Sequence, residues 1–283
     1  LGLVGSEMCI RDSFLSFARS LPLPGRIGLF LVCFWLLAAL AGPLLAPYAV
    51  GAFVDYDVFS PMSGKFWLGS DYLGRDVLSR LLWGARYTVF LGLGAALLAS
   101  VTGTSLALVA AVHKGWVDEV VSRTMDTLIS IPSKVFALVM VAAFGSSLWL
   151  LLLIAAVTYV PGNFRIARAI ALDLAAMDYV TFARAQGETP IRIALGEILP
   201  NMLHPLLADL GLRFVFIVLL LSGLSFLGLG VQPPHADLGS LVRENISGIT
   251  EGAPAIIAPA LAIATLTVGA NLLIDALKKG KTA

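Results

Sequence analysis

The residues of this chain that could carry catalytic chemistry are few and lie far apart. Its three histidines, His113, His204 and His235, stand on separate segments, and none belongs to an H-E-x-x-H metal motif or a G-x-S-x-G nucleophile motif. The two cysteines, Cys9 and Cys33, are too few for a disulfide framework or a metal site. The sequence therefore predicts neither a catalytic centre nor a bound metal, and it argues against a membrane-embedded enzyme.

A nucleotide site is not predicted either. Gly280-Lys281-Thr282 matches the end of the P-loop motif G-x-x-x-x-G-K-[ST], but Asp275 stands where the first glycine is required. The basic end of the chain is more simply a solvated tail. If this protein uses ATP, we expect another chain to bind it.

The composition points to the membrane. The chain has 283 residues, of which 58% are hydrophobic and 13% charged, and its mean hydropathy is +0.91. A soluble domain has about 25% charged and about 45–50% apolar residues. A soluble fold would lack the polar residues to cover its surface, so we predict a multi-span membrane protein.

Apolar segments of spanning length recur along the chain. A helix needs roughly 20 apolar residues to cross a bilayer. The runs do not alternate as β-barrel strands do, and the bilayer core favours helices because it offers no water to backbone groups. The sequence thus predicts an all-α, polytopic integral membrane protein with six transmembrane helices, at about residues 27–46, 87–112, 124–144, 148–163, 214–231 and 255–273.

The Lys and Arg residues set the expected orientation. If the N-terminus is cytoplasmic, most cations near the span ends lie inside, among them Arg26, Arg123, Arg168 and Lys278. This asymmetry predicts an N-in, C-in topology. The first outer loop, 48–86, is the exception, and its acidic residues offset its cations.

The outer segment 69–88, GSDYLGRDVLSRLLWGARYT, reads as an amphipathic helix. Asp76 and Arg80 are spaced to pair on its polar face. Two interpretations remain open, an interfacial helix that positions the second span and a surface that touches an external partner. The expected apolar face consists of Leu73, Val77, Leu78, Leu81 and Leu82.

Ionisable residues are rare inside the predicted spans. Asp209 and Arg213 lie one helical turn apart at the start of the fifth span and are expected to pair. Lys134 falls within the third span, where it would either snorkel to the headgroups or line a pathway. An ion-coupled secondary transporter usually keeps more such residues at mid-membrane, so this class is disfavoured.

The segment 181–201, TFARAQGETPIRIALGEILPN, is polar and would lie in the cytoplasm. Its pattern predicts a helix over about 173–186, then Gly187 in the left-handed conformation that ends helices. Thr189 can cap a second helix with Pro190 in its first position, and that helix is expected to stop near Pro200. Such a segment is either a docking surface or a hairpin on the headgroups, which Arg184 and Arg192 would favour.

This segment resembles the EAA loop of ABC importer permeases, whose pattern is roughly Glu-Ala-Ala, three residues, Gly, nine residues and Ile-x-Leu-Pro. Four residues match it, and three depart from it. The matches are Ala183, Gly187, Leu199 and Pro200; the departures are Thr181 for Glu, Phe182 for the first Ala and Glu197 for Ile.

Other stretches resemble the dipeptide/oligopeptide/nickel permease subfamily in the same order along the chain. They are FWLGSDYLGRDVLSRLLWGARYT, KGWVDEVVSRTMDTLISIPS, EILPN and LSFLGLGVQPP. The resemblance covers about residues 21–279.

The resemblance implies a type I ABC importer permease of a bacterial or archaeal inner membrane. Such a permease pairs with a second permease, two ATPase subunits that bind ATP and Mg, and an extracytoplasmic substrate-binding protein. Neither a cofactor on this chain nor nucleic acid is expected, and the solute would be a peptide or a related small solute such as glutathione or nickel. The implied ATPase-coupling residues are Thr181, Ala183, Arg184, Gly187, Leu199 and Pro200.

Three regions are expected along the chain. Residues 1–20 form an N-terminal tail, in which VGSEMCIRDS resembles a translated sequencing-adapter fragment. Residues 1–13 are interpreted as a non-native artefact, and an ordinary disordered cytoplasmic tail is the alternative. Residues 21–86 hold the first transmembrane helix and the external loop. Residues 87–279 form the transmembrane domain, with a cytoplasmic coupling loop at about 165–205.

Overall fold

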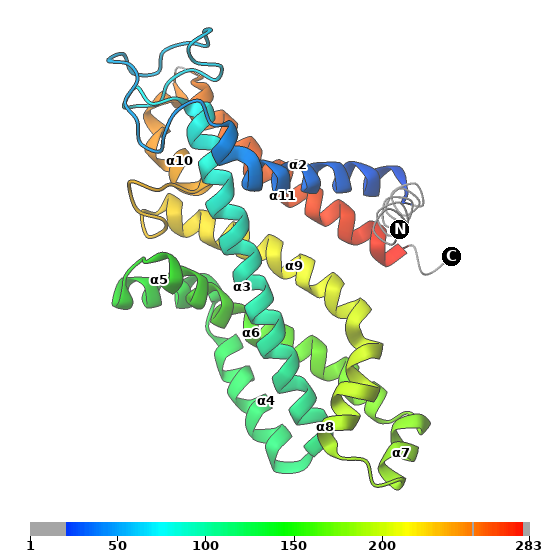
Figure 1. Ribbon diagram of the computed structural model, residues 1–283. Helices are drawn as coiled ribbons and strands as arrows, with labels where there is room; N and C mark the ends of the chain where they lie inside the picture. The colour runs from blue at the N-terminus through cyan, green and yellow to red at the C-terminus, as the bar shows by residue number, and fades with distance from the viewer. Residues whose placement is uncertain (1–20, 251, 280–283) are drawn as a thin grey trace.

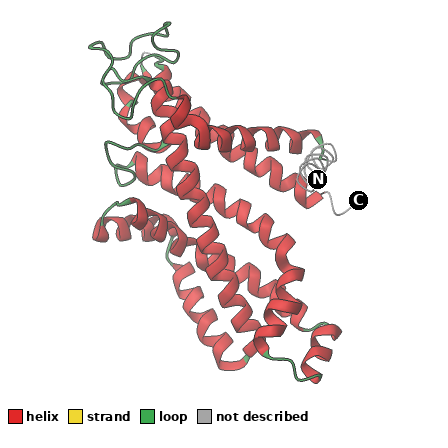
Figure 2. Ribbon diagram, viewed as in Figure 1, coloured by secondary structure: helices red, strands yellow, loops and turns green. Residues whose placement is uncertain are grey.

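The computed structural model describes residues 21–250 and 252–279. The expectations for the tail 1–20 and its first 13 residues lie outside the described residues. Within the described part the secondary structure is helical without β-strands, and loops join the helices (Figure 2). The predicted fold class, all-α, is confirmed. The helices, labelled in Figure 1, are α2 (Leu23–Leu45), α3 (Val77–His113), α4 (Gly115–Ser130), α5 (Ser133–Phe144), α6 (Leu148–Ala175), α7 (Asp178–Ala185), α8 (Pro190–Arg192), the π-helix η1 (Ile193–Ile198), α9 (Leu199–Phe226), α10 (Leu238–Glu244), the 3₁₀ helix η2 (Ile246–Ile249) and α11 (Pro254–Lys279).

Five helical stretches of the described chain are long and apolar enough to cross a membrane. They are α2, α3, α6, the continuous stretch Pro190–Phe226 and α11. The pair α4 and α5 gives a sixth if it is counted as one span, but its two helices are bent by 86°. The prediction of an unbroken helix over 124–144 was therefore wrong. Ile131 precedes Pro132 and is extended (φ −85°, ψ 124°), because a proline disfavours the helical conformation of the residue before it.

The second span begins ten residues earlier than predicted, at Val77. The expected interfacial helix is instead the first turns of α3, and Leu73 precedes it. The Asp76 carboxylate accepts a hydrogen bond from the Ser79 backbone N–H at 2.8 Å and so caps α3. The predicted pair of Asp76 with Arg80 was wrong, because this capping role occupies the carboxylate.

Arg80 belongs to a buried cluster of four charges at the outer end of α3. Its Nη1 lies 2.9 Å from Asp71 and 2.6 Å from Glu244. Arg75 contacts the same two carboxylates, at 2.7 Å and 2.9 Å. The cluster joins the loop 46–76 to α10, and its two cations and two anions satisfy one another away from water.

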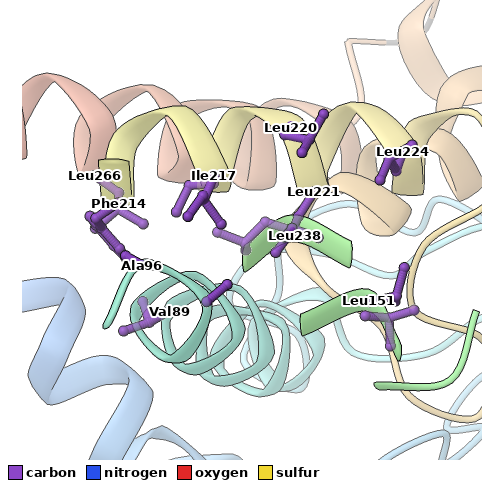
Figure 3. Close-up of a cluster of buried hydrophobic side chains, with 14 of the residues drawn as sticks. Val89, Ala96, Leu151, Phe214, Ile217, Leu220, Leu221, Leu224, Leu238 and Leu266 are labelled. Carbon is purple, nitrogen blue, oxygen red and sulfur yellow. The ribbon is translucent and has the colours of Figure 1, made fainter. Parts of the chain in front are cut away.

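The main apolar core lies between α3, α6, α9, α10 and α11. Figure 3 shows the side chains of α9 directed at α3, with Phe214 beside Ala96 and Leu221 beside Leu238 of α10. A second cluster fills the other end of the bundle. It combines the last turns of α3, the last half of α6, α7, η1 and the start of α9: Ala107, Leu108, Ala110, Ala111, Phe164, Ala167, Ala171, Ala175, Val180, Ala183, Ile193, Ile198, Met202 and Leu206.

Helices α2 and α11 run antiparallel, side by side (Figure 1). The start of α2 and the end of α11 lie on the same side of the molecule as α7 and α8, on the right of Figure 1, whereas loop 46–76 and α10 lie on the left. This arrangement agrees with the predicted N-in, C-in topology and with a cytoplasmic α7–α8 segment.

The α2–α11 contact depends on a glycine. A Cβ on Gly28 would lie 2.6 Å from the Leu273 nitrogen and 2.7 Å from the Gly269 oxygen, both backbone atoms that cannot move aside easily. We therefore expect Gly28→Ala to destabilise the protein by about 1–3 kcal/mol, as overpacking does. Thermal unfolding in detergent, followed by circular dichroism, measures the change.

Gly223→Ala is the matched control, because Gly223 lies inside α9 with no atom within 4 Å of an added Cβ. It should be neutral or slightly stabilising, since alanine has the higher helix propensity. Equal melting temperatures for the two variants would contradict the close packing of α2 on α11.

Candidate coupling site

The polar segment between the two long helices α6 and α9, residues 176–201, is called here the coupling segment. It contains α7, a turn, α8 and the π-helix η1, and it lies at the lower right of Figure 1. The predicted helix over 173–186 was wrong in one respect. Helix α6 ends at Ala175 and α7 starts at Asp178, because Met177 is extended (φ −71°, ψ 152°) and redirects the chain.

The turn after α7 has the predicted form. Gly187 adopts φ +81°, a conformation that side chains with a Cβ rarely adopt. The Gly187 N–H donates to the Arg184 carbonyl at 3.0 Å, and the Glu188 N–H donates to the Ala183 carbonyl at 3.2 Å. These two bonds are the Schellman motif, which satisfies the last carbonyls of α7.

The next helix also begins as predicted but does not end as predicted. The Thr189 hydroxyl accepts a hydrogen bond from the Arg192 N–H at 3.4 Å, and Pro190 takes the first helical position. Helical structure then continues past Pro200 to Phe226. The π turn Ile193–Ile198 ends two residues before Pro200, and local π geometry is one way a helix accommodates a residue without an N–H.

One face of the coupling segment is buried. Val180 and Ala183 of α7 pack into the second cluster together with Ile193 and Ile198 of η1. Leu199 packs partly against the same cluster. A displacement of α7 must therefore displace the last turns of α3 and α6 or the start of α9.

The opposite face is exposed and apolar. Phe182 is 65% exposed, Ile191 70% and Leu195 56%. Sequence reasoning noted Phe182 only as a departure from a pattern and missed Ile191 and Leu195. Their spacing of four residues on one helix would have revealed a shared face.

Charged groups border this apolar face. Arg192 pairs with Glu188 at 3.4 Å. The Arg184 Nη2 and the Glu188 Oε2 are both buried without a hydrogen-bond partner among the described residues. Glu188 pairs with Arg192 through its other oxygen, Oε1, so the border of the apolar face combines one ion pair with the half-buried Arg184.

The six residues predicted for coupling are divided by the structure between two places. Thr181, Ala183, Arg184 and Gly187 lie on α7 and its turn, whereas Leu199 and Pro200 begin α9. Ala183 and Leu199 meet in the second cluster. Thr181, Gly187 and Pro200 are exposed, and Arg184 is half-buried.

A buried polar network lies behind the coupling segment, along α9. Arg213 pairs with Asp209 at 3.0 Å, as predicted. The Asn163 side-chain amide of α6 donates to Asp209 at 2.7 Å, and the Thr104 hydroxyl of α3 donates to Asn163 at 3.3 Å. The network links three spans, and Asn163 and Thr104 were missed because single polar residues in apolar runs carry no pattern.

Comparison with known proteins identifies the family to which this chain belongs. The family model described as binding-protein-dependent transport system inner membrane component matches residues 99–282. The chain belongs to this family. As an inner membrane component it is a multi-pass membrane protein, which the apolar helices also require.

Curated relatives cover most of the chain. A putative peptide transport system permease protein of Brucella suis is 34% identical over 253 residues, 89% of this chain and 85% of the relative. A glutathione transport system permease protein of Pectobacterium atrosepticum is 33% identical, covering 88% and 81%. A dipeptide transport system permease protein of Haemophilus influenzae is 30% identical, covering 94% and 96%.

A solved structure shares the fold. One chain of the methionine ABC transporter MetNI, crystallised in inward-facing conformations, matches with a TM-score of 0.58. The match covers 71% of this chain and 96% of that chain, at 16% sequence identity. The inner membrane component thus has the fold of an ABC importer permease, as the sequence predicted.

The Asp209–Arg213 pair gives a test of the buried network. Asp209→Asn leaves the Arg213 charge without its counter-ion, and breaking a buried pair in this way costs about 3–5 kcal/mol. Thermal unfolding in detergent should show a large fall in stability. Asp126→Asn is the control, because the Asp126–Arg165 pair is largely exposed and contributes about 1 kcal/mol or less. Similar losses for both variants would contradict the buried role of Asp209.

The turn at Gly187 gives a second test. An added Cβ meets no atom within 4 Å, so the cost of Gly187→Val comes from the positive φ alone, about 1–3 kcal/mol. Hydrogen–deuterium exchange over residues 178–193 should increase while the spans stay protected. Gly196→Val is the control, since Gly196 is equally open and has no positive φ. Equal exchange in both variants would show that the turn conformation is not the constraint.

Proposed function

We propose that this chain is the permease subunit of an ATP-driven ABC importer of peptides or a related small solute. With a second permease it would form the transmembrane pathway, each chain supplying half. The support for the solute class is that relatives covering most of the chain are named for peptide, dipeptide and glutathione transport. Glutathione is itself a small peptide, so these names share one chemistry.

The observation that carries the proposal is the two-faced coupling segment. Its buried face is continuous with the ends of three spans, and its exposed face offers apolar side chains to another molecule. An apolar surface bordered by polar and charged groups is typical of a protein–protein contact. We infer that the partner is the groove of an ATPase subunit, one for each permease.

The ATP chemistry then belongs to the partners. ATP and Mg would bind to the two ATPase subunits, and this chain would bind no cofactor. Closure of the ATPases would push on α7 and η1. Because Ala183 and Ile198 pack against the ends of α3 and α6, that push would reach the spans directly.

Loop 46–76, on the outer side of the chain, has the features of a surface that would contact a substrate-binding protein. Loop 46–76 carries large apolar side chains that are exposed, including Phe53, Tyr56, Met62 and Trp67. Aromatic residues and methionine are enriched at protein interfaces. The buried charge cluster of Arg80 holds this loop against α10 and so presents it as a fixed surface.

The headgroup hairpin is the competing interpretation of the coupling segment. Arg184 is half-buried with one nitrogen enclosed, whereas Arg192 pairs with Glu188 while 75% of its side chain is exposed. The Arg192 guanidinium would therefore suit a lipid phosphate or a protein partner, and recovery of the ATPase subunits decides between the two interpretations.

Phe182→Asp tests the ATPase contact. A charge in the centre of an apolar interface should reduce recovery of the ATPase subunits in a tagged pull-down by about tenfold or more, as loss of an aromatic hot spot does. The spans should keep their melting temperature, because Phe182 is exposed.

In uptake assays Gly187→Val should likewise uncouple transport from ATP hydrolysis.

Trp116→Asp is the matched control for this experiment. Trp116 is an exposed aromatic residue at the start of α4, outside the coupling segment. It should leave ATPase recovery unchanged. Full recovery of the ATPases with Phe182→Asp, or recovery of the tagged chain alone from the unmutated protein, would overturn the coupling proposal.

A further inference from the structure

Polar groups lie on an exposed surface of the bundle formed by α5, α6 and α9, within segments that cross the membrane. A lipid-facing surface looks different in this chain. The exposed residues of α2 are large and apolar: Phe30, Phe34, Leu37, Leu40 and Leu44. Exposed polar groups at membrane depth are costly against lipid, so a surface that carries them faces water or a partner.

Tyr159 and Phe216 form the first part of this surface. Tyr159 lies in the middle of α6, and its hydroxyl donates to the Phe216 carbonyl of α9 at 3.2 Å. The two rings are stacked, with centroids 6.4 Å apart and an interplanar angle of 8°. Phe216 is 48% exposed. The pair therefore presents an aromatic surface with a hydroxyl at its edge.

Ser133 and Lys134 form the second part, at the break between α4 and α5. Ser133 lines a small cavity together with Pro161 of α6 and with Thr158, the neighbour of Tyr159 in the chain. Lys134, the next residue, is exposed. Among the described residues no carboxylate pairs with the Lys134 ammonium.

The position of Lys134 does not serve the helix. It lies in the first turn of α5, where the positive end of the helix dipole disfavours a cation. Gly145, which follows the last residue of α5, is eleven residues away, about 16 Å along the helix axis at 1.5 Å per residue. Helix α5 is thus much shorter than the hydrocarbon core, which is roughly 30 Å thick, so Lys134 and Gly145 do not lie at opposite headgroup layers.

Polar side chains also continue from Lys134 toward the cytoplasmic side. Along α4, Ser130, Thr127 and Arg123 are exposed, at helical spacing. These three side chains form an accessible polar stripe, as a water-filled entrance from the cytoplasmic side requires. Helix α4 contacts α6 through the pairs Asp126–Arg165 and Asp118–Arg168.

We propose that Lys134, Ser133, Tyr159 and Phe216 line the solute pathway, and that Lys134 binds a carboxylate of the solute. This inference rests on the proposed function, in which the solute is a peptide. The ammonium would donate charge-assisted hydrogen bonds to the C-terminal carboxylate, and the Tyr159–Phe216 rings would contact an apolar side chain. The residues on this surface then contribute to solute selection after the binding protein has released the peptide.

Uptake into proteoliposomes containing the complete importer tests the carboxylate contact. The probes are dialanine and its C-terminal amide, and each variant is compared with the unmutated protein on the same probe. Loss of one charge-assisted hydrogen bond is worth about tenfold or more, so Lys134→Gln should lower dialanine uptake about tenfold. Uptake of the amide should change less than twofold, and Lys134→Arg should keep most of the dialanine uptake.

Lys278→Gln is the matched control, because Lys278 is an exposed cation near the end of α11, outside the proposed pathway and the coupling segment. It should affect neither probe. Equal losses of both probes with Lys134→Gln would assign Lys134 to a contact with another subunit and overturn the proposal. Unchanged uptake of both would also overturn it.

A labelling experiment decides the pathway position without assuming peptides as solute. Lys134→Cys is placed in a chain whose Cys9 and Cys33 are serine, within the assembled importer in membrane vesicles. A charged methanethiosulfonate reacts with thiolates, which form in water. The residue should be labelled about tenfold faster than Leu37→Cys, on the exposed apolar face of α2.

Labelling of Lys134→Cys no faster than Leu37→Cys would show a lipid-facing, snorkelling residue and would overturn the inference. Fast labelling without any dialanine uptake by the unmutated importer would instead overturn the proposed solute and leave the pathway position standing. The two failures are therefore distinguishable.

Discussion

The bilayer requires each backbone N–H and C=O group in its core to find a partner within the protein, and the rest of this structure follows from that constraint. Unbroken helices meet the requirement with internal hydrogen bonds. Each interruption has to be satisfied by some other group. At Pro132 the break stands against the middle of α6, beside Thr158 and Ser133, and the turn at Gly187, outside the spans, satisfies its own helix end with the Schellman bonds. The helices are thus interrupted where the chain forms a turn or a bend in place of a straight membrane-spanning helix.

Two buried charged networks hold the ends of the long helix α3 to the rest of the bundle. At the outer end, Arg80 joins the loop 46–76 to α10; further inside, Thr104 connects through Asn163 to the Asp209–Arg213 pair. Both networks contain balanced charges, so neither needs water or a counter-ion. The apolar core between them is non-directional, and the hydrogen-bonded networks add the fixed geometry that apolar packing alone does not specify.

The sequence predicted what local patterns encode. The apolar runs gave the spans, and Gly187, Thr189 and Pro190 gave the turn and the helix start, because their backbone preferences are local. It did not predict the bend at Pro132 within an apolar run, since a proline can also be carried within a continuing helix, as Pro200 is in the same chain. The choice between these outcomes depends on tertiary neighbours. The spacing of Ile191 and Leu195 places them on one face, but the exposure of that face and of Phe182 is decided by what the opposite face packs against.

The π turn Ile193–Ile198 sets the rotational phase of the fifth span. A π turn holds about one residue more than an α turn, and one residue corresponds to about 100° around a helix axis. The helical stretch Pro190–Phe226 is therefore a single rod whose two ends are turned relative to each other. That offset lets Ile191 and Leu195 point outward at one end while Phe214 and Val218 point into the core at the other. Deleting one residue of the turn would keep the composition almost unchanged and still rotate the exposed apolar face by about 100° relative to the core-facing side of α9.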